Sequence, residues 1–237
     1  MSPRVPSPLV WIKNLSGQLL RGVLGLLFPA VCKSCGTRLE RADELVCQNC
    51  WSRLQPVSDE ILRGKLIPEN LDAIYAVYLF DERMQRLVHA LKYRDFRTMG
   101  VKLGIAMGKR FLALSPKMSR AALVPIPLHP QKYRERGYNQ SEWLARGVES
   151  VLSFPVRPRL LQRIKYTKSQ TKLNARERQD NVRDAFRLSA SYQRDLFESV
   201  ILVDDVFTTG ATMNSAAGVC KAAGISTVVS LTAAMPI

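Results

Sequence analysis

The sequence predicts an α/β protein, built as a parallel sheet with flanking helices, that follows a small four-cysteine module. From about residue 70 onward, short apolar runs typical of buried strands alternate with segments of helical periodicity. This alternation is typical of a parallel sheet covered by helices on both faces. Four of the five cysteines lie within nineteen residues, as two Cys-x-x-Cys pairs. The 237 residues suffice for one medium domain and one small module.

Composition and charge restrict the class of partner. Apolar residues make up 46% of the chain and charged residues 23%, which argues against disorder as the overall state. The net charge is +15, from 35 Lys and Arg against 20 Asp and Glu. A positive field of this size favours nucleic acid or phosphorylated small molecules as partners. A solvated basic surface without a specific partner is the alternative.

The first 28 residues are expected to form an amphipathic segment with a short helix over residues 19–28, which Pro29 ends. Arg21 interrupts the apolar stretch, and no apolar run in the chain reaches the ~18–20 residues that cross a bilayer. We therefore expect no membrane span. A secretory signal is the alternative interpretation of this stretch.

The cysteine module is expected over residues 29–57. Its two pairs are separated by eleven residues and satisfy the four thiolate ligands of a tetrahedral zinc ion. An iron–sulfur cluster or reduced structural cysteines are the alternatives. A closed four-thiolate site leaves no open coordination position, so the zinc is expected to be structural. Clustered thiols of this kind indicate a reducing compartment, and hence the cytoplasm. The expected zinc ligands are Cys32, Cys35, Cys47 and Cys50.

A polar stretch over residues 58–70, with Gly64 and Pro68, separates this module from a second domain over residues 70–237. The second domain begins with an apolar strand over 73–80. Helices follow over 84–93, where Leu87, Val88 and Leu91 share a face, and over 101–114. The next strand is expected over 121–128, and a helix over 140–152.

The last part of the chain is expected to form a strand over 199–203, a helix over 212–223 and a closing strand over 227–233. Gly224 ends the helix, and the lone Cys220 within it is expected in the core. His89 lies within a helical pattern and is interpreted as structural, whereas His129, in a loop, is more open to a functional role.

The segment 200–212 carries the strongest functional pattern. Four apolar residues are followed by two adjacent acids, and a Thr- and Gly-rich loop then opens a helix. Ligands of α/β sheets bind at the carboxyl ends of strands, and helix N-termini attract phosphate. The acids would accept hydrogen bonds from vicinal sugar hydroxyls or hold Mg²⁺. The pattern therefore predicts a ribose 5-phosphate site, and an ordinary strand–turn–helix is the alternative. The site comprises Asp204, Asp205, Thr208, Thr209, Gly210, Ala211 and Thr212.

This thirteen-residue segment closely resembles the signature of type I phosphoribosyltransferases. The resemblance implies that Asp204 and Asp205 contact the ribose hydroxyls of 5-phosphoribosyl-1-pyrophosphate, as the catalytic acids, while residues 208–212 hold its 5-phosphate. Residues 124–140 leave a strand and enter a helix through a basic loop, in which Lys132, Arg134 and Arg136 could face a pyrophosphate.

Residues 124–140 also resemble the ComF family of competence proteins, which is phosphoribosyltransferase-like and includes ComFC and GntX. The leading four-cysteine module, the Ala-Leu-Lys-Tyr segment 90–93, the segment 167–186 and the loop 204–212 all match that family. The resemblance covers nearly the whole chain from Pro29 onward. It implies a type I phosphoribosyltransferase-like fold behind a zinc-ribbon-like module.

A basic stretch over residues 157–187 holds ten Lys or Arg against three acids. By resemblance to phosphoribosyltransferases it forms a lid that closes over pyrophosphate and excludes water. A nucleic-acid track, with Tyr166 among the cations, and a solvated helix are the alternatives. The lid candidates are Lys165, Lys168, Lys172, Arg176 and Arg178.

Two functional classes stay open at this point. In the first, the chain is an enzyme that transfers 5-phosphoribosyl to a nitrogen acceptor and releases pyrophosphate with the help of Mg²⁺. In the second, which the ComF resemblance implies, the chain takes part in natural transformation or DNA utilisation. Its partners would then be single-stranded DNA and a competence helicase.

Overall fold

The computed structural model describes residues 30–41, 45–92, 97–114, 118–165, 184–190 and 197–237. The expected helix over 19–28 lies outside these residues, as does most of the basic stretch. The chain divides into two compact units between Arg53 and Leu54. The two units are described separately below.

In its described residues, 30–41 and 45–53, the first unit contains the four cysteines and little regular structure. Val31 and Arg38 form an antiparallel bridge, and helix α2 spans Gln48–Ser52. Backbone hydrogen bonds from Cys32 to Thr37 and from Gly36 to Cys32 close a tight loop around the first cysteine pair. The second pair flanks the start of α2, since Cys47 is its N-cap residue and Cys50 lies on its buried side.

The second unit is built on a four-stranded parallel sheet with the order β1-β6-β5-β2. Its strands are β1 (Ala73–Leu79), β2 (Ala121–Pro125), β5 (Ser199–Val206) and β6 (Thr227–Met235). Every residue of β2 is buried, as are eight of the nine residues of β6, because helices cover both faces of a parallel sheet. The predicted fold class, a parallel sheet with flanking helices, is confirmed.

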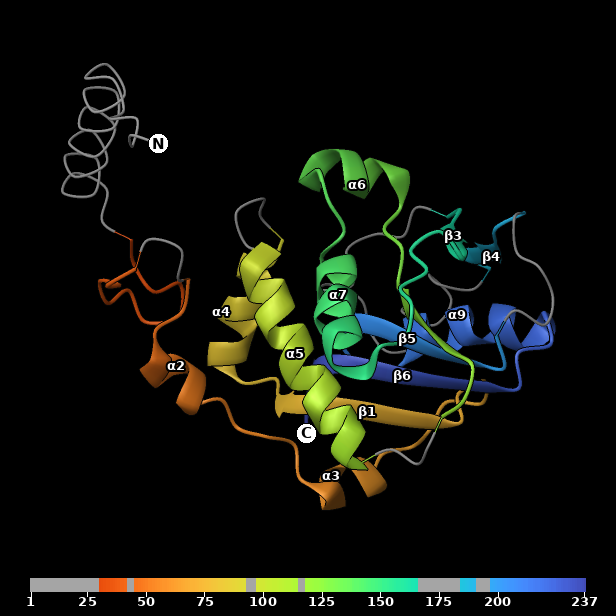
Figure 1. Ribbon diagram of the computed structural model, residues 1–237, viewed down its shortest axis with the longest axis horizontal. Helices are drawn as coiled ribbons and strands as arrows, with labels where there is room; N and C mark the ends of the chain where they lie inside the picture. Colours follow the sequence, from red (N-terminus) through yellow and green to blue (C-terminus); the bar gives the residue numbers. More distant parts are fainter. Residues whose placement is uncertain (1–29, 42–44, 93–96, 115–117, 166–183, 191–196) are drawn as a thin grey trace, which may run out of the picture. The chain divides into compact units, whose positions relative to one another are not determined.

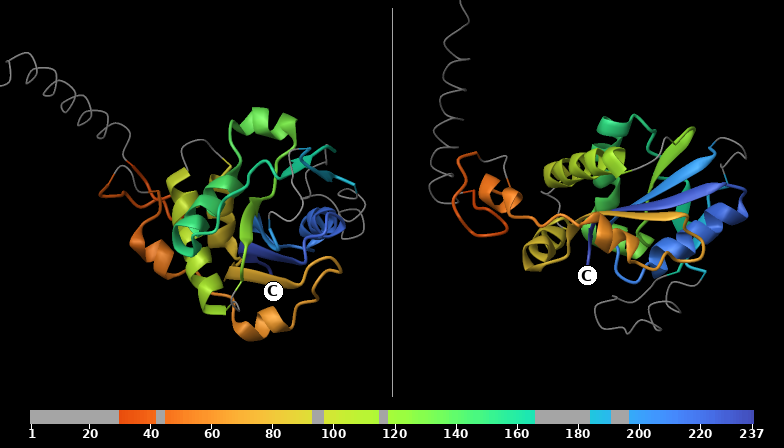
Figure 2. Two further views of the ribbon diagram at one scale, coloured as in Figure 1. Left: turned by 45° about the vertical axis from the view of Figure 1, so that its right-hand side comes forward. Right: turned by 90° about the horizontal axis from the view of Figure 1, so that it is seen from below.

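Helices lie on both faces of the sheet (Figures 1 and 2). Helices α5 (Arg97–Leu114) and α7 (Gln140–Leu152) cover one face and pack against each other, whereas α9 (Ala211–Ala222) covers the other. Two shorter helices, α3 (Asp59–Arg63) and α4 (Glu82–Ala90), flank β1 in the chain. The buried side of α9 includes Cys220, as the sequence predicts.

The connections after β2 and β5 leave the sheet on opposite faces. The chain runs from β2 to α7 on one face, and from β5 to α9 on the other. Because β2 and β5 are neighbours, their carboxyl ends flank a topological switch point. Open α/β sheets bind their ligands at such points.

Three of the differences from the sequence prediction affect segments that carry site residues. The expected basic loop contains a helix, α6 (Pro130–Arg136), because proline is tolerated at the first helical position and His129 caps the helix. Strand β5 continues three residues beyond its expected end at 203, because β6 runs alongside and pairs with Asp204 and Val206. Two short strands, β3 (Leu161–Arg163) and β4 (Phe186–Leu188), form an antiparallel pair.

Among the described residues, no helix combines the length and apolar character that a membrane crossing requires.

Candidate functional site

The β5–α9 connection lies at the switch point. Phe207 is buried at the end of β5, whereas Thr208 and Thr209 are exposed. Gly210 is the N-cap residue of α9 and has φ = 74°, a left-handed conformation that glycine adopts without strain. The Thr209 hydroxyl accepts a hydrogen bond from the Ala211 N–H at 3.4 Å. The loop therefore presents threonine hydroxyls and the first N–H groups of a helix on one exposed turn.

Asp204 is half-buried and held by two donors. The Ser141 hydroxyl donates a hydrogen bond of 2.8 Å to its Oδ1 atom, and the backbone N–H of Asp205 donates to the same oxygen at 2.9 Å. Burial and the neighbouring charge of Asp205 raise the pKa of Asp204 to about 7, while the two hydrogen bonds and the charge of Arg163 oppose this rise. The second oxygen of the carboxylate takes no part in these two bonds.

The charges of two cations act on the second acid. Burial raises the pKa of Asp205, and the positive charges of Lys92 and Arg136 act in the opposite direction. Lys92 follows α4, and Arg136 ends α6, so the two cations come from different parts of the chain. Asp205 thus lies beside positive charges that could meet an anionic ligand bound near it.

The three basic residues predicted to face pyrophosphate lie on α6 but differ in their surroundings. Arg136 is the member whose charge acts on Asp205, and its Nη1 atom donates to Gln140 Oε1 at 3.0 Å. Lys132 instead forms an ion pair with Glu135 at 2.7 Å, and Arg134 is exposed.

The residues predicted to form a lid are mostly outside the part of the chain that the structure describes. This holds for Lys168, Lys172, Arg176 and Arg178. Lys165 is described, and it is exposed just after β3.

Sequence reasoning missed three residues that the fold brings to the acids: Ser141, Lys92 and Arg163. Ser141 is fully buried in the first turn of α7, which Asn139 caps through a hydrogen bond to the Ser141 N–H. Arg163 lies at the end of β3, where its guanidinium is 5.4 Å from the Phe186 ring centroid. Burial lowers the pKa of Arg163, and the charge of Asp204 opposes that change. A search for polar residues in the first turn of each predicted helix would have found Ser141.

The two histidines have ordinary surroundings. His129 is the N-cap residue of α6, and its Nδ1 atom accepts a hydrogen bond from the Gln131 N–H at 3.3 Å. His89 is an exposed residue in the last turn of α4. The cap gives His129 a structural role in beginning α6.

The four cysteines form a compact cluster in the first unit. Their sulfur atoms all lie within 4.8 Å of one another, and those of Cys35 and Cys47 are 3.7 Å apart. A tetrahedral zinc ion with Zn–S bonds of ~2.3 Å requires sulfur atoms ~3.8 Å apart, so the cluster has the right dimensions. The Cys47 N–H donates a hydrogen bond to Cys32 Sγ at 3.4 Å, so a backbone donor of the second pair holds a sulfur of the first.

The pKa values of two cysteines of the cluster are shifted in opposite directions. Hydrogen bonds from Thr37 lower the pKa of Cys35 to about 6, whereas burial raises the pKa of Cys50 to about 12. Four thiolates so close together repel one another unless a cation shares their charge. The donor set and its geometry therefore fit a structural zinc ion.

Comparison with known proteins agrees with this geometry. Residues 23–61 match the family described as double zinc ribbon domain. The fold and the cysteine cluster thus define a zinc-ribbon protein with a parallel α/β domain. Among its relatives, competence protein F of Haemophilus influenzae is 26% identical over 86% of this chain and 90% of its own length.

Two further relatives have similar coverage. DNA utilization protein YhgH of Escherichia coli O157:H7 is 26% identical over 89% of this chain and 92% of its own length. Competence protein ComFC of Bacillus subtilis is 26% identical over 76% of this chain and 79% of its own length. These proteins are homologues of the chain, and they confirm the ComF-family resemblance that the motifs indicate.

Proposed function

We propose that the chain binds 5-phosphoribosyl-1-pyrophosphate, or a related ribose phosphate, at the β5–α9 loop, and that it does so in a DNA-uptake or DNA-utilisation role. The observation that supports this ligand is the pair of acids at the end of β5, directly before the exposed threonine turn. The relatives' names, competence protein and DNA utilization protein, support the cellular role.

The proposed ligand contacts follow from the chemistry of the loop. The 5-phosphate would accept hydrogen bonds from the N–H groups and hydroxyls of residues 208–212, where the helix dipole also favours an anion. Carboxylate oxygens of Asp204 and Asp205 would accept hydrogen bonds from the vicinal ribose hydroxyls. Lys92 and Arg136, beside Asp205, would face the pyrophosphate at the anomeric carbon.

Mg²⁺ is the cofactor that we expect to bind together with this ligand. Its preferred ligands are oxygens, and the site offers two adjacent carboxylates of which one oxygen is already committed to Ser141. Mg²⁺ bound there would neutralise pyrophosphate oxygens and draw the ligand toward the acids.

Calorimetry of the full chain with ribose 5-phosphate and with 5-phosphoribosyl-1-pyrophosphate, each with and without Mg²⁺, tests the proposal. We expect binding by the wild type and its loss when Asp204→Asn and Asp205→Asn are combined. Asp81→Asn is the matched control, because Asp81 caps α4 and asparagine caps helices equally well. Unchanged binding by the double variant would refute the assignment of the acids.

Phosphoribosyl transfer is the second candidate function, favoured by the cations beside Asp205. In this reaction the bond between the anomeric carbon and pyrophosphate breaks, and the departing oxygen keeps the electron pair. The acceptor nitrogen supplies the pair for the new C–N bond and loses its proton to water. Lys92 and Arg136 would stabilise the departing pyrophosphate. The test is to measure pyrophosphate release while metabolite fractions are added as acceptors. We expect the wild type to release pyrophosphate when the acceptor is present, and the Asp204/Asp205 double variant to release none. If no metabolite fraction causes release, binding alone is the function.

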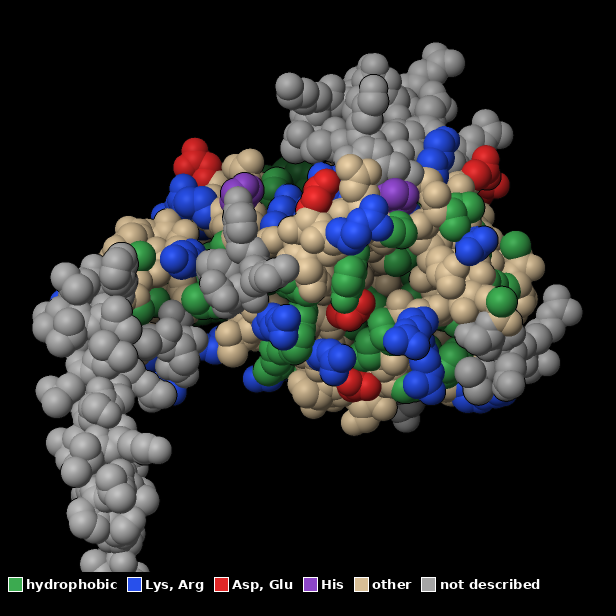
Figure 3. Space-filling view, turned by 90° about the horizontal axis from the view of Figure 1, so that it is seen from above, with side chains coloured by type: hydrophobic (Ala, Val, Ile, Leu, Met, Phe, Trp, Pro, Cys, Tyr) green, Lys and Arg blue, Asp and Glu red, His purple; other side chains and the backbone are tan. Residues whose placement is uncertain are grey.

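Single-stranded DNA is the macromolecular partner that we propose, with a competence helicase as the protein partner implied by the ComF resemblance. Lys and Arg side chains are spread over the face shown in Figure 3 rather than gathered in one stripe. On the α5–α7 side, Arg97 and Arg146 stack on Trp143, with guanidinium carbons 5.2 and 5.3 Å from its ring centroid. Stacked guanidinium groups keep their donors available for phosphates.

Fluorescence anisotropy with a labelled single strand tests the DNA partner. The logarithm of the affinity should fall with the logarithm of the salt concentration, with a slope of about 0.7 per neutralised phosphate. Replacing Arg97 and Arg146 by glutamine should reduce this slope, whereas Arg86→Gln, an exposed residue of α4, should not. A flat salt response of the wild type would exclude a phosphate-backbone contact. Helicase binding is tested separately, by co-purification of the two full-length proteins.

A further inference from the structure

One stripe of α9 faces a short piece of chain that precedes β1. This piece, residues 68–72, lies between α3 and β1. The α9 residues that face it are Gly210, Asn214, Gly218 and Lys221. Their spacings of four, four and three residues place them on a single face of the helix. The 68–72 segment therefore runs along α9 from its first residue to its last turn.

The type of contact between α9 and residues 68–72 changes along the helix. At the loop end, a Cβ atom added to Gly210 would lie 2.7 Å from the Pro68 ring, so the Gly210 backbone lies close against that ring. One turn later, the backbone N–H of Asn70 donates to Asn214 Oδ1 at 2.9 Å. The Asn70 side chain then covers Gly218, with its amide nitrogen 3.3 Å from an added Cβ atom.

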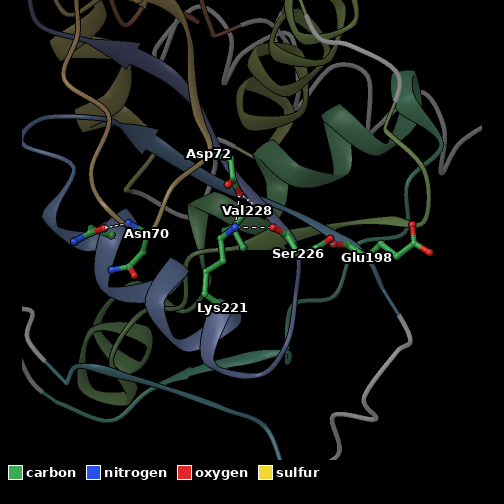
Figure 4. A network of polar contacts seen from close by, with 7 residues as sticks. Asn70, Asp72, Glu198, Lys221, Ser226 and Val228 are labelled. Atoms are coloured by element: carbon green, nitrogen blue, oxygen red, sulfur yellow. Dashed lines mark hydrogen bonds and ion pairs between the residues drawn. The ribbon is translucent and has the colours of Figure 1, made fainter.

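The far end of α9 is held by an ion pair. Lys221 Nζ lies 2.7 Å from Asp72 Oδ2 and 2.6 Å from the Ser226 carbonyl oxygen. The same Asp72 oxygen accepts a hydrogen bond of 2.6 Å from the Val228 N–H, at the start of β6 (Figure 4). This end of the helix is thus attached to the amino end of the sheet, far along α9 from the threonine turn.

Asn214 holds the opposite end, close to the proposed ligand. It lies in the first turn of α9, and its own N–H donates to the Gly210 carbonyl at 2.8 Å. Its side chain accepts from Asn70, in a segment that continues directly into β1 and hence into the sheet that carries the acids. The bond therefore fixes the first turn of α9, and the loop before it, relative to Asp204 and Asp205.

We propose that Asn214 is a positioning residue for the ribose-phosphate site, and this inference rests on the proposed function of the β5–α9 loop. Through Asn70 it holds the N–H groups of residues 208–212 at the distance from the acids that one ribose phosphate spans. A donor array fixed in advance binds an anion more tightly than one that must be ordered on binding. Loss of the Asn214 acceptor also leaves the partly buried Asn70 N–H without its partner.

The test compares two variants that weaken opposite ends of the same helix. Asn214→Ala removes the acceptor at the loop end, and Asp72→Asn removes the charge that pairs with Lys221 while keeping an acceptor for Val228. Both should lower Tm by a few degrees (about 2–4 °C). The affinity for ribose 5-phosphate with Mg²⁺, measured by calorimetry well below both Tm values, should fall about fivefold to tenfold for Asn214→Ala alone. Asn214→Ser, which keeps a shorter side-chain oxygen, should give an intermediate loss and serves if the alanine variant does not fold.

The outcomes separate this inference from the proposed function. If the wild-type protein binds ribose 5-phosphate and both Asn214 variants bind it with the same affinity, the positioning role is overturned and the ligand site is not. An equal loss of affinity in Asp72→Asn would also overturn it, because general loosening of α9 would then explain the effect. A wild-type protein that does not bind ribose 5-phosphate would remove the proposed function itself.

Discussion

Ser141 and Asp204 lie 63 residues apart in the chain, yet the Ser141 hydroxyl donates to Asp204 Oδ1 at 2.8 Å. The bond crosses the switch point, because Ser141 belongs to the helix that follows β2 and Asp204 to the neighbouring β5. A buried hydroxyl that donates to one oxygen of a half-buried carboxylate restricts the rotation of that carboxylate. Ser141 therefore orients the acid that we expect to meet the ribose.

Ser141→Ala should weaken ribose-phosphate binding because the Asp204 carboxylate loses this constraint. A hydrogen bond to a charged group contributes ~1.5–3 kcal/mol, so we expect a loss of affinity of about tenfold or more. Calorimetry of the variant with ribose 5-phosphate and Mg²⁺ measures it. Ser150→Ala is the matched control, since Ser150 lies on the same helix and its hydroxyl donates to the Gly147 carbonyl at 2.7 Å. Equal affinities of the two variants would contradict the orienting role.

The raised pKa of Asp204 makes the free protein less stable as the pH rises. Burial and the Asp205 charge move this pKa from an ordinary 3.8 to about 7, so the folded state holds a proton that the unfolded state has already lost. The stabilisation is complete below about pH 4 and is lost as the pH approaches 7. The slope due to this group is at most ~1.4 kcal/mol per pH unit.

Asp204→Asn should remove this pH dependence while keeping an acceptor oxygen for Ser141. The variant should therefore gain stability over the wild type as the pH rises through this window, and the gain should level off above about pH 7. Denaturant unfolding of both proteins between pH 5 and 8, without added Mg²⁺, measures the difference. A stability difference that does not change with pH would show that Asp204 ionises normally in the folded protein.

The sequence predicted the main sheet because each of its strands is a local apolar run. Helix α7 was predicted with its observed bounds, since Asn139 is a strong N-cap residue and the expected periodicity begins directly after it. Helix α6 was missed because the basic segment between the strand and the next helix was interpreted as a loop, although proline at the first helical position is compatible with a helix. The end of β5 was placed too early because polar acids rarely continue a buried strand, and only pairing with β6 extends it.

Only part of the candidate site could be predicted from patterns within single segments of the sequence. The acids and the threonine turn are contiguous, so a single segment predicts them as a group. Ser141, Lys92 and Arg163 come from three other segments, and the order of strands in the sheet brings them together. That order depends on which helix covers which face, and a pattern within one segment does not contain this information. The role of the loop in ligand binding stays a prediction.

Zinc should be required for the folding of the first unit. The part of this unit that the structure describes has little regular structure, so the metal–thiolate bonds would supply much of its stability. Elemental analysis should give one zinc per chain, and Cys35→Ser or Cys47→Ser should lose it. Cys220→Ala, a buried cysteine of α9, should keep the metal. Full metal content in the Cys35 and Cys47 variants would contradict the four-cysteine site.

Contact between α5 and α7 should depend on the absence of a side chain at Gly104. An added Cβ atom would lie 2.1 Å from the Leu144 carbonyl oxygen and 2.8 Å from the Gly147 Cα atom, so the helices would have to separate. Gly104→Ala should therefore lower the free energy of unfolding by ~1–3 kcal/mol or more, despite the higher helix propensity of alanine.

Gly64→Ala is the control for this prediction. Gly64 has φ = −77° at the C-cap of α3, and an added Cβ atom would meet nothing closer than 3.4 Å. Denaturant unfolding should give the Gly64 variant a stability near that of the wild type. Because α7 carries Ser141 at its first turn, separation of the helices should also weaken ribose-phosphate binding in Gly104→Ala. A Gly104 variant as stable as the Gly64 variant would mean that α5 and α7 tolerate a wider spacing, and that the position of Ser141 does not depend on their close approach.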